Sequence, residues 1–242
     1  MKDVANEIKN SNFCIVLTGA GISTESGIPD FRSKNGIWSR YDINEYGHIQ
    51  NFLENPEKIW KMLREMILNM KLAEPNKAHY AIAEMEKLGY IKAVITQNVD
   101  NLHRKAGSKN VIEFHGNFTK MRCIKCGRKY EYEEIKLNEL PPKCECNGVI
   151  KPDIIFFGEE IPRYAFFEAF QLANKCDLFI TVGTSCEVYP ASELPLTAKR
   201  RGAKIIEINR EDTALTPLAD YVLRGKAGKI LEEILIEIKN LH

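Results

Sequence analysis

The sequence predicts an α/β protein with a doubly wound parallel sheet and a smaller inserted module. Short apolar runs rich in β-branched residues alternate with segments of helical periodicity along most of the 242 residues. This pattern is typical of a parallel sheet covered by helices on both faces. Polar loops that contain glycine follow several of the runs. One cysteine-bearing, charged and turn-rich stretch interrupts the alternation and indicates the insertion.

The expected strands are the apolar runs, and the expected helices are the segments with apolar residues at helical spacing. Strands are predicted at 13–18, 91–96, 177–183, 203–209 and 220–225. The last four runs are expected to be buried on both sides of the sheet. Helices are predicted at 56–70, 76–89, 163–175, 190–202 and 226–241.

Composition argues against several classes of protein. Lys+Arg number 34 and Asp+Glu 33, so the chain has no net field that would attract nucleic acid or an anionic membrane. The longest apolar runs are far too short to cross a bilayer. The first residues mix charges through an amphipathic pattern and lack the apolar core of a signal peptide. We therefore expect a cytoplasmic protein with no membrane contact and no direct nucleic-acid binding.

Four of the seven cysteines form two closely spaced pairs between residues 123 and 146. An odd total clustered in this way is typical of a metal site in a reducing compartment, not of a disulfide framework. Four thiolates can bind Zn²⁺ as a tetrahedron, and a filled shell makes the metal structural and not catalytic. Four buried free thiols are the alternative. The predicted ligands are Cys123, Cys126, Cys144 and Cys146.

These features predict how the chain is divided. The cysteine pairs place a zinc-ribbon module at 117–152, and 33–75 is expected to form a loop and helical module. The remaining segments, 1–32, 76–116 and 153–242, are expected to form one Rossmann-like domain.

The first glycine loop, "GAGISTESGIPDFR" at 19–32, matches only part of a dinucleotide-binding motif. Gly19 and Gly21 would let the backbone approach a pyrophosphate, but the third glycine position is Thr24. The acidic residue expected at the end of the next strand is also missing, so Asn209 is the candidate ribose partner. Turn glycines are common in α/β folds, so the motif alone leaves a purely structural loop open.

Other polar loops follow strands at 96–107, at 182–185 and near 226–228. Ligands of open α/β sheets bind beyond the carboxyl ends of the strands, so these loops are candidates for the same site. His115, in "VIEFHGN" directly before the cysteine-rich stretch, is a plausible general base, with a hydrogen-bonded structural histidine as the alternative. The structural role is preferred for the other histidines, His48, His79, His103 and His242.

Together, "GAGIS", "SGIPDFR", "TQNVDNLHRKAG", "FHG", "FFGE", "VGTS" and the cysteine pairs closely resemble the motifs of the sirtuin family of NAD-dependent protein deacylases. Two of the motifs, "TQNVDNLH" and "GIPDFR", are highly specific. The resemblance covers nearly the whole chain in the family's order, so it implies one sirtuin catalytic core over 1–242. It also implies NAD as a co-substrate and a structural Zn²⁺ ion.

The resemblance implies a role for each matching residue. The segment after the glycines would fold over NAD, with Phe31 shielding the reacting ribose carbon. Asp100 would hold the nicotinamide carboxamide, and His115 and Asn98 would be the catalytic residues. The implied NAD-binding residues are Gly19, Ala20, Gly21, Thr24, Asp30, Phe31, Arg32, Gln97, Asn98, Val99, Asp100, Gly183, Thr184, Ser185, Asn209 and Ala227.

The implied reaction consumes NAD and transfers no hydride. The carbonyl oxygen of an acyl-lysine would attack the anomeric carbon of the ribose as nicotinamide leaves, and His115 would then act as general base on a ribose hydroxyl. Water would complete the reaction and give free lysine and O-acyl-ADP-ribose. The acetylated protein or peptide would lie between the domains as an added strand. The implied substrate-binding residues are Phe157, Gly158, Glu159, Val188 and Tyr189.

The acyl group is inferred from one helix of the smaller module. Family members that remove succinyl carry a Tyr and an Arg three residues apart, and the matching positions here are the apolar Leu63 and Met66. Arg64 is one position off the expected face. We therefore expect a deacetylase, or an enzyme for longer neutral acyl groups, over a desuccinylase.

Rival functions use the same motifs differently. A mono-ADP-ribosyltransferase would use the same NAD site but label protein. A non-catalytic NAD sensor or zinc-ribbon interaction protein would bind NAD without turnover. A dehydrogenase fits worst, because the third glycine and the strand-end acid are both missing. We expect a monomer.

Overall fold

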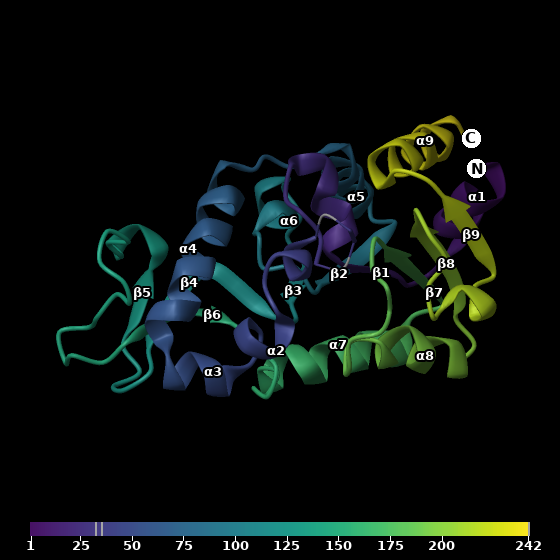
Figure 1. Cartoon of the computed structure of the whole chain (residues 1–242). Coiled ribbons are helices and arrows are strands. Elements are labelled where there is room, and N and C mark those ends of the chain that lie inside the picture. Colours follow the sequence, from purple (N-terminus) through teal and green to yellow (C-terminus); the bar gives the residue numbers. More distant parts are fainter. Residues whose placement is uncertain (32, 35, 242) are drawn as a thin grey trace.

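Two β-sheets organise the part of the chain that the computed structural model describes, residues 1–31, 33–34 and 36–241 (Figure 1). The larger sheet is parallel, with six strands in the order β3-β2-β1-β7-β8-β9. Numbered within this sheet alone, the order is 3-2-1-4-5-6, that of a doubly wound Rossmann fold, so the predicted fold class is confirmed. Its strands are β1 (Cys14–Thr18), β2 (Ile91–Thr96), β3 (Val111–Glu113), β7 (Leu178–Val182), β8 (Lys204–Asn209) and β9 (Tyr221–Arg224).

Helices cover both faces of this sheet (Figure 1). Alternate strand residues point to opposite faces, so Val16 packs into one core and Leu17 into the other. Helices α1 (Lys2–Asn10), α5 (Lys77–Lys87) and α9 (Ala227–Asn240) cover the face of Val16. Helices α7 (Arg163–Lys175) and α8 (Glu193–Arg200) cover the other face.

Strand β9 differs from its prediction as a buried strand. It is the last strand in the order and, among the described residues, pairs only with β8, so one of its edges is unpaired there. Its residues alternate between half-buried and exposed, and Val222 is exposed. The apolar run at 220–225 therefore forms an edge strand. The local sequence pattern of a short apolar run does not distinguish an edge strand from a central strand.

The smaller sheet is antiparallel, with the strand order β5-β4-β6. It packs against helices from the 33–75 segment, and the two segments predicted as separate modules share one apolar core. The buried Trp60 joins them, because its indole Nε1 donates to the Ile150 carbonyl over 2.9 Å. The elements are β4 (Gly116–Cys123), β5 (Lys129–Glu131), β6 (Ile150–Ile154), α2 (Ile43–Tyr46), α3 (Ile49–Glu54) and α4 (Pro56–Leu72).

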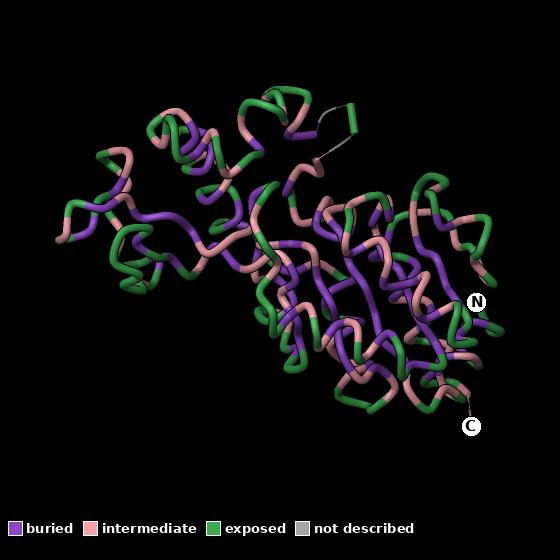
Figure 2. Tube along the Cα trace, turned by 90° about the horizontal axis from the view of Figure 1, so that it is seen from below, coloured by how far each residue is buried: buried purple, intermediate pink, exposed green. Residues whose placement is uncertain are grey.

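Strands β1 and β7 at the centre of the large sheet are buried throughout, and further buried stretches of the trace lie in the smaller part of the molecule (Figure 2). Helix α4 begins at Pro56 after Asn55, whose side chain accepts from the Lys58 amide. No described helix combines the length and the apolar character that a bilayer span requires. The short elements are α6 (Leu102–Lys105) and the 3₁₀ helices η1 (Ala20–Ser26), η2 (Ile37–Ser39), η3 (Tyr132–Glu134) and η4 (Thr216–Leu218).

Candidate active site

A cleft of about 2190 Å³, part of it open to solvent, lies at the carboxyl ends of the parallel strands and extends to the smaller sheet. All described residues predicted to bind NAD or peptide line it, except Asp100, which lines an adjoining cavity. Arg32 lies outside the described residues. The predicted residues in the cleft wall are Gly19, Ala20, Gly21, Thr24, Asp30, Phe31, Gln97, Asn98, Val99, His115, Phe157, Gly158, Glu159, Gly183, Thr184, Ser185, Val188, Tyr189, Asn209 and Ala227.

The adjoining cavity, about 490 Å³ including space open to solvent, has a buried polar floor. Ser23 donates its hydroxyl to Asp100 over 2.7 Å, and the Asn98 amide nitrogen lies 3.1 Å from the Ser23 hydroxyl oxygen. All three residues are buried. Burial raises the pKa of Asp100, although its hydrogen bonds act in the opposite direction. The floor therefore offers a buried acceptor and amide to a polar group that enters the cavity, and Ser23 is a site residue that the sequence analysis missed.

His115 is positioned by contacts to two different strand ends. Its carbonyl accepts from the Ile155 amide, and its Nδ1 lies 3.1 Å from the Gln97 carbonyl oxygen. Because a carbonyl only accepts, Nδ1 carries the proton and Nε2 keeps its lone pair. Burial lowers the pKa of His115 below its ordinary 6.5. The ring is therefore neutral near pH 7, as a general base must be.

The glycine loop contacts a second loop more closely than the sequence predicts. The Gly19 amide donates to the Val182 carbonyl and the Gly21 amide to the Gly183 carbonyl. A Cβ on Gly21 would lie 2.7 Å from the Cα of Gly183, which itself has φ +59°. Gly19 and Gly21 are therefore required by the close approach of the neighbouring loop, and their amides already donate hydrogen bonds within the protein.

The far end of the cleft is organised by a buried carboxylate that the sequence analysis missed. Glu207, 1% exposed, accepts hydrogen bonds from Thr213, Thr216 and Arg224 at 2.6 to 2.8 Å. These bonds hold the loop after β8 against the sheet, and Thr213 lines the cleft. Asn209, at the end of β8, donates to the Thr184 carbonyl over 3.0 Å. A single acidic residue in an apolar strand belongs to no motif or periodic pattern, so the sequence does not identify it as a site residue.

The predicted peptide-binding segment is already paired on one side. The Phe157 amide donates to the Gly47 carbonyl, and the Phe157 carbonyl accepts from the Ile49 amide. Gly158 makes no backbone hydrogen bond with another described residue. Of the segment 157–159, Gly158 therefore has its backbone groups free to pair with an added strand.

Helix α4 supplies an apolar part of the cleft wall. Met62, Leu63 and Met66 line the cleft, whereas Arg64 lies exposed on the outer side of the helix. The wall therefore has no cation from this helix at the positions considered for acyl recognition.

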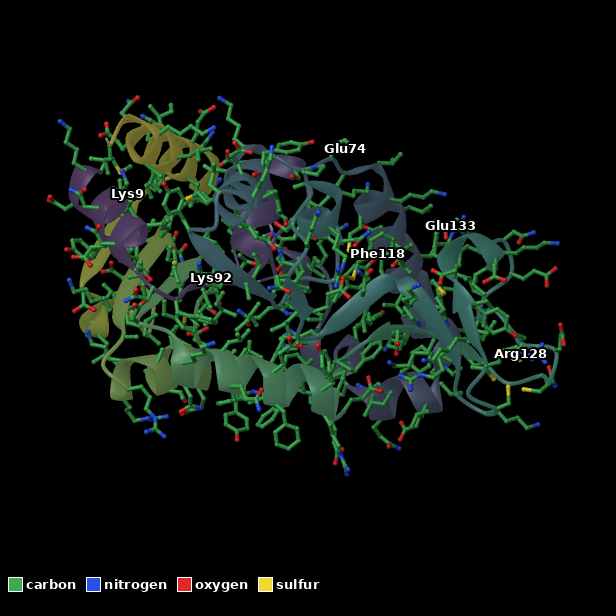
Figure 3. The ribbon with its side chains drawn as sticks, turned by 180° about the vertical axis from the view of Figure 1, so that it is seen from behind. Lys9, Glu74, Lys92, Phe118, Arg128 and Glu133 are labelled. Carbon is green, nitrogen blue, oxygen red and sulfur yellow. The ribbon has the colours of Figure 1, made fainter. Side chains whose placement is uncertain are left out.

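The four clustered cysteines lie at the end of the small sheet, where Figure 3 shows Arg128 beside the sulfur atoms. Their sulfurs all lie within 4.8 Å of one another, and Cys123 to Cys146 and Cys126 to Cys144 measure 3.5 and 3.6 Å. A tetrahedral zinc site with bonds of about 2.3 Å needs sulfurs about 3.8 Å apart. The residues fit Zn²⁺. Tyr130 donates its hydroxyl to Cys144 over 3.0 Å, which lowers the pKa of that thiol and favours the ligating thiolate.

Two of the histidines for which the sequence favours a structural role are buried in the protein and do not line the cleft. His79 and His103 are buried with their ring centroids 4.9 Å apart. His79 closes the capping box of α5, and His103 lies 2.9 Å from the Thr18 hydroxyl oxygen. Burial lowers the pKa of both rings, that of His79 to about 4.

Known proteins share this architecture. The Sir2 family model matches residues 19–190. An NAD-dependent protein deacetylase 1 of Pyrobaculum aerophilum is 47% identical over 100% of this chain and 96% of that protein. An NAD-dependent protein deacylase of Thermococcus kodakarensis is 44% identical over 98% of this chain and 95% of its own length.

Solved structures agree with these relatives. A Sir2 homolog–NAD complex has a TM-score of 0.93 and 44% identity, over 99% of this chain and 94% of that one. A complex of Sir2 with a p53 peptide and NAD⁺ has a TM-score of 0.91 and 40% identity, over 98% of both chains. The chain therefore belongs to the Sir2 family.

Proposed function

We propose that the protein is an NAD-dependent protein lysine deacetylase that releases nicotinamide and forms O-acetyl-ADP-ribose. One observation carries the proposal: a neutral histidine, whose Nε2 has no hydrogen-bond partner among the described residues, shares one cleft with the glycine loops and with both predicted peptide segments. Similar proteins are deacetylases or deacylases, and one similar structure holds a deacetylated p53 peptide with 3′-O-acetyl ADP-ribose.

The cleft suits NAD because it provides separate environments for the two halves of a dinucleotide. Asn209 and the 183–185 loop would hold the adenosine half, and Ser23, Asn98 and Asp100 would receive the carboxamide of nicotinamide. When bound, NAD supplies an electrophilic ribose carbon with nicotinamide as its leaving group. Phe31 lines both cavities and would exclude water between them.

His115 would remove a proton from a ribose hydroxyl through Nε2. The Gln97 carbonyl holds the opposite nitrogen, so the ring is presented in the basic tautomer and is stabilised when it becomes charged. Asn98, one of the two predicted catalytic residues, donates its amide to the Gly19 carbonyl over 3.2 Å and would orient the ribose.

The acetylated peptide would lie as an added strand between 157–159 and 188–189. Gly158 would supply the pairing groups, because Phe157 is already bonded on its other side. The acetyl-lysine stem would pass along the apolar wall formed by Met62, Leu63 and Met66. The monomeric state, the cytoplasmic location and the domain boundaries stay predictions.

The direct test incubates the zinc-loaded protein with NAD and an acetyl-lysine peptide and follows all products by mass. We expect free lysine, nicotinamide and O-acetyl-ADP-ribose in equal amounts. NAD consumption that occurs without the peptide and leaves ADP-ribose on protein would instead establish the transferase.

The pH profile should report the neutral form of His115. Burial lowers the pKa of its ring below 6.5, so protonation removes the base only in more acidic solution. We expect kcat/KM to be level near pH 7 and above and to fall about tenfold per pH unit below the pKa. The measurement is kcat/KM from pH 5 to 8.5, with recovery of activity at pH 7.5 as the control. A midpoint above 6.5 would contradict the assignment.

Acyl preference should follow the apolar wall of α4. We expect acetyl to be removed about a hundredfold faster than succinyl, because burying an unpaired carboxylate costs several kcal/mol. Matched acetyl- and succinyl-lysine peptides measure this ratio. The double variant Leu63→Tyr with Met66→Arg should narrow or reverse it, while Arg64→Ala, on the exposed side, should leave it unchanged. Equal rates in the unmodified protein would rule out the proposed wall.

A further inference from the structure

Lys151, on β6 of the small sheet, is a buried cation that the proposed chemistry does not use. Its side chain is 8% exposed, and a lysine buried to this degree requires partners for its charge. Nζ lies 2.7 Å from the Ile154 carbonyl, 3.3 Å from the Pro152 carbonyl and 3.0 Å from Glu159 Oε2. The ammonium group also lies 5.1 Å from the centre of the Phe156 ring. All three N–H donors of Lys151 thus have acceptors at the root of the 156–159 segment.

Glu159 connects this buried charge to the cleft. Its Oε2 accepts both from Lys151 and from the Phe156 amide, the latter over 2.8 Å. Oε1 makes no hydrogen bond with another described residue, and Glu159 lines the cleft. One oxygen therefore fixes the side chain, and the other is available to an incoming donor.

The same segment is held from its opposite side by the helical module. Phe157 exchanges two backbone hydrogen bonds with Gly47 and Ile49. Between these two attachments lies Gly158, whose backbone groups are free among the described residues. The conformation of Gly158 (φ +86°) is therefore fixed by its neighbours and not by its own contacts.

We propose that Lys151 is a positioning residue for the peptide: through Glu159 it sets the edge on which the substrate strand pairs and presents Oε1 to a donor of that strand. This inference rests on the proposed deacetylase function. It assigns to a residue of the cysteine-bearing small sheet an effect on peptide binding and no effect on NAD binding. Loss of the ammonium group leaves the Glu159 carboxylate without its cation and frees the segment to move toward solvent.

The experiment compares Lys151→Met, which keeps the length and apolar stem of the side chain, with Lys151→Arg, which keeps the charge. Binding of a fluorescein-labelled acetyl-lysine peptide is measured by anisotropy, beside the KM values for peptide and NAD, zinc content and thermal unfolding. We expect Lys151→Met to weaken peptide binding and raise the peptide KM about tenfold, with the NAD KM within about twofold and one zinc retained. Lys151→Arg should lie closer to the unmodified protein.

Two further variants keep the proposal falsifiable. Glu159→Asp retains the charge but shortens the link, so it should give the same selective loss even if Lys151→Met folds poorly. Lys239→Met removes a lysine paired with Glu84 at the surface and should change neither KM. Unchanged peptide affinity in Lys151→Met and Glu159→Asp, or an equal loss for NAD, would overturn the proposal. No turnover by the unmodified protein would instead overturn the deacetylase function.

Discussion

Replacing His115 by alanine is expected to lower kcat about a thousandfold, because a positioned general base contributes about 10² to 10⁴ in rate. The Ile155 amide holds the backbone at this position. Within the described part of the chain, the one hydrogen bond of the side chain is to the Gln97 carbonyl, so its removal should leave the fold intact. NAD binding should persist, because the predicted adenosine and nicotinamide contacts come from other loops. Single-turnover product formation and calorimetric NAD binding measure the two effects separately.

A matched control for this variant is His48→Ala. His48 is exposed, with its ring 5.6 Å from that of Phe157, so it can influence peptide binding but has no position from which to accept a ribose proton. The kcat of the His48→Ala variant should be nearly unchanged. Partial rescue of His115→Ala by added imidazole would support the role of base. If His115→Ala kept more than about a tenth of the normal kcat, another group would have to carry the proton.

Cys144→Ser is expected to release the metal and unfold the small sheet. Structural zinc supplies apparent binding free energies of about 10 to 16 kcal/mol in zinc-finger peptides, comparable with the whole stability of a typical domain. Cys123 and Cys144 also belong to the apolar core that the small sheet shares with α4, so the damage should reach Leu63 and the cleft wall. Zinc content, near-UV circular dichroism and the thermal midpoint follow the loss, and activity should disappear with it.

Cys176→Ala provides the control for this second effect. Cys176 is also buried, but it lies in the core between α7 and the large sheet, away from the sulfur cluster. This variant should keep one zinc and lose only the stability of a small buried side chain, about 1 kcal/mol. A Cys144→Ser protein that keeps one tightly bound zinc and its near-UV spectrum would show that the cluster is not a structural metal site.

The parallel sheet could be predicted from the sequence because its strands are local apolar runs, and these runs alternate with segments of helical periodicity. The sequence also placed the site, because strand-end loops converge wherever parallel strands share an edge. It did not predict that Gly21 packs on Gly183, since the two are brought together only by the order of β1 and β7. A glycine in such a loop can be required because a ligand approaches the backbone closely or because another loop does. The presence of glycine in the sequence does not show which of the two reasons applies.

The core shared by the helical and cysteine-bearing segments was missed for a related reason. The two segments, 33–75 and 117–152, are separated by β2 and β3 in the chain, and only tertiary packing unites them. Lys151 and Glu207 were also missed, because a charged residue in a strand is recognised as buried only when its partners are known.

The placement of Trp60 has a practical consequence, because the chain contains only two tryptophans. Trp60 is fully buried where helix α4 meets the cysteine-bearing small sheet, whereas Trp38 lines the cleft with its ring 5.5 Å from that of Phe31. The fluorescence of Trp60 therefore reports the packing between α4 and the small sheet. The fluorescence of Trp38 reports changes in the cleft. Replacing either one by phenylalanine leaves the other as a single intrinsic optical probe, so occupancy of the cleft and assembly of the module can be followed without an attached dye.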